Sequence, residues 1–143
     1  MKLDVIIGFL LEGTFPFISS HLRFTRMMLI QILGHVEGIN KKNGVYEILK
    51  KDNVLFYFGF GSMGNLGGIR IFDIQHLKIE YSFVLDLLQN NNINYEFDSD
   101  KMMCQIENGV KVYFDEEQKY ILEILKAEDK TLEKRLTATN TAR

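Results

Sequence analysis

The sequence predicts an α+β fold: two pseudo-repeats, each a helix plus a three-stranded antiparallel meander, form one mostly antiparallel sheet with helices on one face. Two observations lead to this fold class. Helical and strand-like segments follow one another in the same order twice, and the second set lies about 55 residues after the first. The strand-like segments alternate apolar and polar residues, which is typical of a sheet with one buried face. The repeats are expected at about residues 12–76 and 77–126.

The first repeat begins with an expected helix between Thr25, a suitable N-cap, and Gly34, a suitable C-cap. Leu29, Ile32 and Leu33 share one face of this helix, because they follow the i, i+3, i+4 spacing. Three strands are expected to follow, at residues 45–49, 54–58 and 69–72.

The second repeat begins with an expected helix over residues 81–88, in which Val84, Leu87 and Leu88 share one face. Further along, Asn108-Gly109 is a strong hairpin signal, because these residue types tolerate the positive φ angles of a tight turn. Three strands are again expected, at residues 102–106, 110–114 and 120–124.

The pattern after the second repeat is ambiguous. Residues 115–118 fit either a turn or a helix start, so residues 116–126 could be strand or helix. The repeat favours a turn followed by a strand. A short helix is expected within 126–136, which closes a single domain of residues 1–136. Residues 137–143 are small and polar, and we expect them to form a disordered tail.

The composition indicates one globular domain and excludes several classes of protein. The 143 residues are 46% hydrophobic and 25% charged, which supplies a core and argues against disorder. Cys104 is the only cysteine, so an intrachain disulfide and a CxxC-type zinc site are excluded. The apolar run from Leu3 to Leu11 is too short to span a bilayer and lacks the flanks of a signal peptide. We therefore expect a cytoplasmic protein with a reduced thiol.

The distribution of charge favours a basic protein partner. Residues 1–129 carry 13 basic and 18 acidic side chains, a net charge of −5, whereas the whole chain carries −2. Nucleic acids and anionic membranes are bound by clustered Lys and Arg, so the acidic body disfavours both as partners. Simple solubility is the alternative explanation for so modest a charge.

A glycine-rich run at residues 59–64 matches the GxGxxG pattern of dinucleotide sites and follows a strand. Such a site needs a helix next, because the helix N-terminus holds the pyrophosphate. Here the strand-like residues 69–72 follow instead. We expect a flexible hairpin loop, which could adapt to a protein partner through residues such as Gly61 and Asn65.

No other motif indicates catalysis, a cofactor or a metal site. His21, His35 and His76 lack the i, i+4 spacing of a metal-binding helix. Cys104 lies among alternating apolar residues and is interpreted as a small core residue. Paired carboxylates lie in turn-like segments, where they are usually solvated. We therefore expect a protein that is not an enzyme and uses no cofactor.

The outward face of the sheet is the expected binding surface. If the most apolar alternate residues are buried, Tyr57 and its repeat equivalent Tyr113 face outward together with Lys111. Met103, Gln105 and Glu107 would lie beside Tyr113. Tyrosine is enriched at interface hot spots, because its rigid ring buries area while its hydroxyl stays hydrogen-bonded. Cross-strand packing and cover by the N-terminal segment are the alternatives.

The helix that ends in Leu33-Gly34 before a strand meander is similar to the tandem-repeat architecture of β-lactamase-inhibitor-like domains. The run Gly-Val-Lys-Val-Tyr-Phe-Asp at residues 109–115 resembles small bacterial immunity proteins of polymorphic-toxin and contact-dependent growth inhibition systems. The similarity spans roughly residues 12–126. The resemblance implies a protein that binds and blocks a cognate toxin domain in the cell that makes it, and it supplies no catalytic residue.

The sequence thus favours a non-enzymatic immunity protein that binds a basic toxin surface. One alternative is a small ligand-binding or enzymatic domain with a cleft between the repeats, in which His35 or His76 acts as a base. A subunit of a homo-oligomer joined through an edge strand is another, and the sequence leaves the oligomeric state open. The expected partner-binding residues are Tyr57, Tyr113, Met103, Glu107, Lys111, Asp115, Glu116, Gly61 and Asn65.

Overall fold

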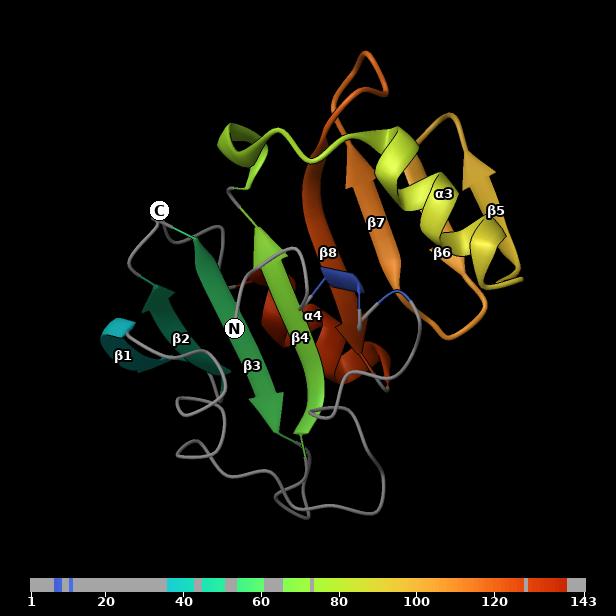
Figure 1. Cartoon of the computed structure of the whole chain (residues 1–143). Coiled ribbons are helices and arrows are strands. Elements are labelled where there is room, and N and C mark those ends of the chain that lie inside the picture. Colours follow the sequence, from blue (N-terminus) through green and yellow to red (C-terminus); the bar gives the residue numbers. More distant parts are fainter. Residues whose placement is uncertain are drawn as a thin grey trace.

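The computed structural model describes residues 7–8, 11, 36–42, 45–50, 54–60, 66–72, 74–127 and 129–138 of the chain. Within them, eight strands form one antiparallel sheet in the order β1-β2-β3-β4-β8-β7-β6-β5 (Figure 1). This order describes two four-stranded meanders that join where β4 pairs with β8. The strands are β1 (Val36–Lys42), β2 (Val45–Lys50), β3 (Leu55–Phe60), β4 (Leu66–Phe72), β5 (Tyr95–Asp98), β6 (Met103–Ile106), β7 (Lys111–Phe114) and β8 (Ile121–Ala127).

The predicted antiparallel α+β fold is confirmed, but the predicted layout of two helix-plus-three-strand units is wrong. Each meander has four strands, because β1 and β5 add a strand at the start of each. The six predicted strands correspond to β2, β3, β4, β6, β7 and β8. In the second half a helix precedes the meander, whereas the helix expected between Thr25 and Gly34 lies outside the described residues.

Alternation along the strands sends side chains into two separate apolar clusters, one on each face of the sheet. On β3, Phe56 and Phe58 belong to the larger cluster, while Tyr57 between them belongs to the smaller one. The larger cluster is the main core and draws residues from both meanders, among them Ile71 of β4 and Ile124 of β8. A sheet that is buried on both faces needs a cover on each.

Helix α3 (Tyr81–Asn90) covers the core side of the second meander (Figure 1). Val84 and Leu88 are fully buried in the main core, and Leu87 packs against it, as the periodicity predicted. The helix ends where the Ile93 N–H donates to the Leu88 carbonyl oxygen at 2.9 Å. We call this side of the sheet the α3 face.

Helix α4 (Lys130–Ala138) packs on the opposite side, against β3, β4 and β8 (Figure 1). Its Leu132 and Leu136 are buried in the smaller cluster. The expectation of helices on one face is therefore wrong, because the second face carries enough apolar side chains to bind its own helix. We call this side the α4 face. Helix α4 includes residues 137 and 138 of the expected tail, and residues 139–143 lie outside the described part of the chain.

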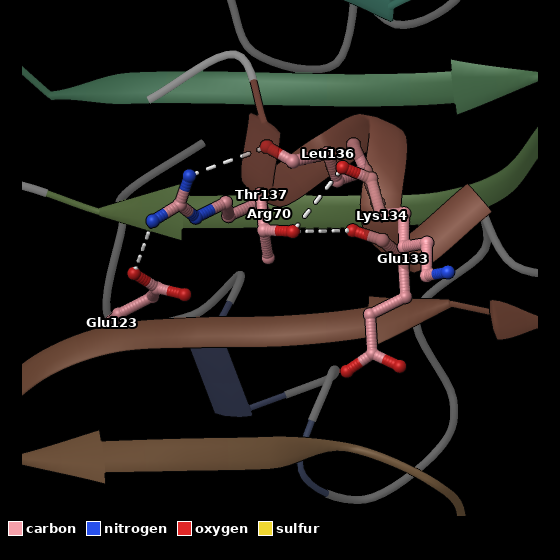
Figure 2. Close-up of polar contacts among 6 residues, drawn as sticks. All are labelled: Arg70, Glu123, Glu133, Lys134, Leu136 and Thr137. Atoms are coloured by element: carbon pink, nitrogen blue, oxygen red, sulfur yellow. Dashed lines mark hydrogen bonds and ion pairs between the residues drawn. The ribbon is translucent and has the colours of Figure 1, made fainter. Parts of the chain in front are cut away.

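The buried Arg70 of β4 anchors the C-terminal end of α4 (Figure 2). Its Nη1 donates to the Leu136 carbonyl oxygen at 3.2 Å, and its Nη2 lies 2.6 Å from Glu123 Oε1 on β8. The guanidinium carbon also lies 4.3 Å from the centroid of the Phe72 ring. A cation is favoured here, because the unpaired carbonyl groups at a helix C-terminus carry partial negative charge.

Two turns of the second meander follow the sequence signals. The Gly109 N–H donates to the Ile106 carbonyl oxygen, and Gly109 has a φ of 92°, which glycine adopts without strain. The hairpin at Asn108-Gly109 is thus confirmed, with Glu107 as a third loop residue. The second turn, residues 115–118, leads directly into strand β8. This settles the ambiguous segment as turn and strand.

Candidate protein-binding surface

The α4 face continues past α4 onto β5, β6 and β7. The strand register arranges its outward side chains in two rows. Glu96, Gln105 and Lys111 lie opposite one another in the first row, and Asp98, Met103 and Tyr113 in the second. We call these six residues the β5–β7 face. It combines apolar, amide and charged groups on neighbouring strands.

Tyr113 and Met103 form the apolar centre of the β5–β7 face. They are register partners, as the sequence analysis expected. Met103 is only 5% exposed, while Tyr113 remains half-buried. Burial raises the pKa of the Tyr113 phenol, and the positive charge of Lys111 opposes that rise. The phenol is therefore neutral at physiological pH and can both donate and accept a hydrogen bond.

Three carboxylates lie to one side of this centre. Asp98 of β5 is the register partner of Met103, Glu96 lies one row further on, and Glu107 lies beyond that row at the β6–β7 turn. Glu96 and Glu107 are exposed, and Asp98 is partly exposed. Glu107 Oε2 accepts a hydrogen bond from Asn94 at 3.2 Å, and Asp98 Oδ1 accepts one from the Asp100 backbone N–H at 3.0 Å. None of the three forms an ion pair with another described residue.

The lysine of the face does not balance these carboxylates. Lys111 Nζ lies 2.8 Å from Glu133 Oε1 of α4. That hydrogen bond, reinforced by the charge of Glu133, raises the pKa of Lys111 against an opposing effect of burial. Because Glu133 neutralises Lys111, the β5–β7 face presents a net negative surface.

Two open hollows indent the surface along β5 and β6. One has a volume of about 480 Å³ and is lined by Asn94, Tyr95, Glu107 and Gly109, among others. The other has a volume of about 410 Å³ and is lined by residues that include Asp98, Ser99, Lys101 and Met103. Both share Glu96 and Gln105, which therefore stand between them.

The predicted turn residues Asp115 and Glu116 lie at the far end of β7 from Glu107. Asp115 Oδ1 accepts hydrogen bonds from the backbone N–H groups of Lys119 at 2.7 Å and Tyr120 at 3.3 Å, so it holds the β7–β8 turn together. Glu116 is exposed in that turn. The structure therefore does not gather these acidic residues with Glu107 in one cluster.

The expectation that Tyr57 faces solvent is wrong. It lies on the α4 face with Tyr113, as predicted, but α4 covers it and leaves it 1% exposed. Its ring packs edge-on against Phe72, with centroids 4.8 Å apart. Gly61 and Asn65 lie outside the described residues.

Gln105 lies beside Tyr113 on the outward face, as predicted, whereas two residues of the site, Glu96 and Asp98, were not predicted there. Their signal was present in the segment Tyr95-Glu96-Phe97-Asp98, which alternates aromatic and acidic residues as a half-buried strand does. Its short length and its position beside turn-forming residues concealed the strand.

The structure places two of the side chains that the sequence offered as candidates for chemistry, Cys104 and His76. Cys104 is fully buried, and burial raises its pKa to about 11, so its thiol stays protonated, as expected for a core residue. His76 is exposed on a short 3-10 helix (Gln75–Leu77). Among the described residues, no three His, Cys, Asp or Glu side chains gather closely enough to hold a metal ion.

No protein-family model, curated protein or solved structure matches this chain. Within the described part of the chain, no helix has the length and apolarity needed to cross a membrane.

Proposed function

We propose that this protein is a non-enzymatic binding module that docks a basic protein surface on its β5–β7 face. One observation carries the proposal: carboxylates without a cationic partner among the described residues lie beside a tyrosine–methionine pair. Aromatic residues and methionine are enriched at interfaces, and flanking carboxylates select a basic partner. The two hollows can receive partner side chains.

The electrostatics favour fast capture of a basic partner. Residues 1–129 carry a net charge of −5. The three carboxylates of the site add a local field of the same sign. Such complementarity mainly raises the association rate, while buried aromatic anchors slow dissociation.

The resemblance of residues 109–115 to immunity proteins suggests the kind of partner. In this proposal the partner is a toxin domain whose functional surface is basic, and binding blocks that surface. The β5–β7 face includes Lys111 and Tyr113 from that run. In this proposal the chain inhibits the toxin domain by covering its functional surface, and it catalyses no reaction.

The experiment uses the protein encoded directly upstream of this chain as the probe. It is expressed with and without this chain, and growth of the host cells is measured. Binding of the two purified proteins is measured by calorimetry at low and high salt. We expect protection of growth and an affinity that falls with salt. An upstream protein that neither inhibits growth nor binds this chain would contradict the proposal.

Replacing the aromatic anchor tests the site. We expect Tyr113→Ala to weaken the complex by about 2 kcal/mol, roughly 30-fold, because an interface hot spot loses its buried ring. The matched control is Phe83→Ala, which removes an exposed ring from α3 on the other side of the sheet. Unchanged affinity in the folded Tyr113→Ala protein would remove Tyr113 from the interface.

A second candidate function is a small ligand-binding or enzymatic domain. The hollow of about 480 Å³ favours it, because that volume lies within the range of ligand pockets and Asn94, Gln105 and Glu107 supply polar groups. A rise in melting temperature with one member of a metabolite panel would favour this function. Binding of the upstream protein, with no such rise, would favour the first.

A further inference from the structure

Strand β5 is the last strand of the sheet on the side of the β5–β7 face. Its hydrogen-bonding pattern with β6 follows from one contact, in which the Glu107 N–H donates to the Asn94 carbonyl oxygen at 3.0 Å. In an antiparallel ladder, hydrogen-bonded pairs alternate with pairs that share no hydrogen bond. The backbone N–H and C=O groups of Glu96 and Asp98 therefore form their hydrogen bonds with β6.

The intervening residues, Tyr95 and Phe97, direct their backbone N–H and C=O groups away from β6. Among the described residues, nothing accepts from or donates to these groups. Their side chains pack against the main core beneath α3, so the strand itself is held in place. A fixed strand with an open row of backbone groups is a template for an added strand.

Both hollows run along this strand. The first is lined by residues 94–96 and the second by residues 96–99. Side chains two residues apart on one face of an extended segment are separated by roughly 7 Å. Successive outward side chains of an added strand can therefore enter one hollow each.

Charge selects the added strand. On the α4 face, Glu96 and Asp98 of β5 would lie beside the side chains of the added strand that point to the same face. Glu107 would lie close to one end of that added strand. Lys or Arg at alternate positions satisfies these carboxylates. A second copy of this chain does not satisfy them. When β5 pairs antiparallel with the β5 of a second copy, and the two α4 faces lie on the same side, carboxylates stand opposite carboxylates, which is destabilising.

We infer that the partner adds an extended segment to β5, with basic side chains at alternate positions on the α4 face. This inference rests on the proposed function and names its binding mode. Main-chain hydrogen bonds to Tyr95 and Phe97 supply affinity, and the alternate basic side chains supply specificity.

The probe is the capped heptapeptide Lys-Thr-Lys-Val-Lys-Thr-Lys. When its lysines face Glu96 and Asp98, its Thr and Val residues lie opposite Tyr95 and Phe97 and direct their N–H groups toward β5. Two isomeric peptides of equal charge are compared, one N-methylated at Thr and Val, the other at three Lys residues. We expect methylation at Thr and Val to weaken binding at least about tenfold, and methylation at Lys to have little effect.

Two further measurements complete the test. Hydrogen exchange at the Tyr95 and Phe97 amides should slow on peptide binding, while the Glu96 amide, already bonded to β6, should not change. Glu96→Lys should weaken binding, whereas the matched control Asp86→Lys, an exposed charge on α3, should not.

Equal binding of the two methylated peptides, or no binding of the parent peptide, would overturn strand addition. The proposed function fails separately, when the upstream protein does not bind this chain. A third outcome is that the upstream protein binds and Tyr113→Ala weakens this binding, but the Tyr95 and Phe97 amides stay unprotected from hydrogen exchange. In that case the partner docks on the β5–β7 face without adding a strand.

Discussion

At the scale of single residues, Gly59 and Gly68 decide how closely α4 approaches the sheet. They face each other across β3 and β4. A Cβ atom at Gly59 would lie 2.5 Å from Leu132 Cδ1, and one at Gly68 would lie 2.8 Å from Leu136 Cδ1 and 2.9 Å from the Lys126 carbonyl oxygen. The first glycine of the GxGxxG run therefore makes room for a helix rather than for a phosphate.

Adding a methyl group at this contact should destabilise the fold. We expect Gly68→Ala to lower the free energy of unfolding by about 1–3 kcal/mol, because the Lys126 carbonyl oxygen belongs to the backbone of β8 and cannot move freely. Gly8→Ala is the control, since its Cβ would lie 3.6 Å from Leu87 Cδ1, an ordinary contact. Urea unfolding measures both. Equal midpoints would show that α4 has room at Gly68.

The buried thiol makes stability depend on alkaline pH. Burial raises the pKa of Cys104 from 9.0 to about 11, so the folded state holds this proton more tightly than the unfolded state. The stabilisation is complete below pH 9 and is lost as pH rises toward 11. We expect wild type to lose about 2 kcal/mol more than Cys104→Ala between pH 8 and pH 11. Parallel pH profiles from denaturant unfolding would contradict this.

At this scale, the sequence could predict which face of the sheet a side chain occupies, because side chains alternate along a strand. It could not predict whether a helix covers that side chain. Tyr57 and Tyr113 were expected on one face, and both lie on the α4 face. Nothing local in the sequence shows that Leu132 and Leu136 bury one tyrosine and leave the other half-exposed. A short helix with two leucines can pack on either face of a sheet, and its choice depends on the whole surface. The small residue Gly59 was the remaining hint.

At the scale of elements, two ion pairs lie beside α4 in different surroundings. Arg70 and Glu123 join β4 to β8 beneath the end of the helix, while Lys111 and Glu133 join β7 to α4 itself. Arg70 and Glu123 have side chains that are 6% and 19% exposed, whereas Lys111 and Glu133 are 28% and 30% exposed. Removing one partner of a buried pair leaves a desolvated charge without compensation. The same change in a more exposed pair costs little.

The loss of folding stability should therefore differ between Glu123 and Glu133 when each is replaced by the neutral glutamine. We expect Glu123→Gln to cost about 2–3 kcal/mol, and Glu133→Gln to cost less than about 1 kcal/mol. Replacing both members of the buried pair, as in Arg70→Met with Glu123→Leu, should recover much of the loss. Chemical denaturation of the four proteins tests this. Similar costs for the two single variants would mean that water screens the Arg70 pair.

Six strands and the helix α3 could be predicted because apolar periodicity marks them. The two missed strands, β1 and β5, are the edges of the sheet. On β5 every side chain is at least partly exposed, so its apolar pattern is weak. For β1 a signal existed: Asn43-Gly44 stands between the register partners Lys42 and Val45. For β5 the alternation of Tyr95 and Phe97 was the signal. Two of the six residues of the β5–β7 face, Glu96 and Asp98, thus lie on a strand that was not predicted from the sequence.

At the scale of the whole molecule, the β4–β8 pair makes one body of the two meanders. Ile71 and Ile124 are register partners across this junction, and both are fully buried in the main core. That core also contains Phe56 of the first meander and Val112 of the second. Shared burial of this kind couples the two halves in unfolding.

A substitution that creates a cavity at the β4–β8 junction should lower the stability of both meanders equally. We expect Ile124→Ala to cost about 2–5 kcal/mol and to lower amide protection in β3 and β7 by the same amount. Leu77→Ala, at an exposed position in the 3-10 helix, should change neither. Native-state hydrogen exchange is the measurement. A loss confined to the second meander would mean that the halves unfold independently.

The order in which the strands are made has a consequence for the nascent chain. A ribosome delivers β4 before β8, and the roughly fifty residues between them take several seconds to synthesise at 5–20 residues per second. During that interval the future centre of the sheet is an unpaired edge, able to join the same edge of a neighbouring polypeptide. Once β4 has left the ribosome, this edge can therefore pair with a neighbouring chain until β8 emerges and pairs with it.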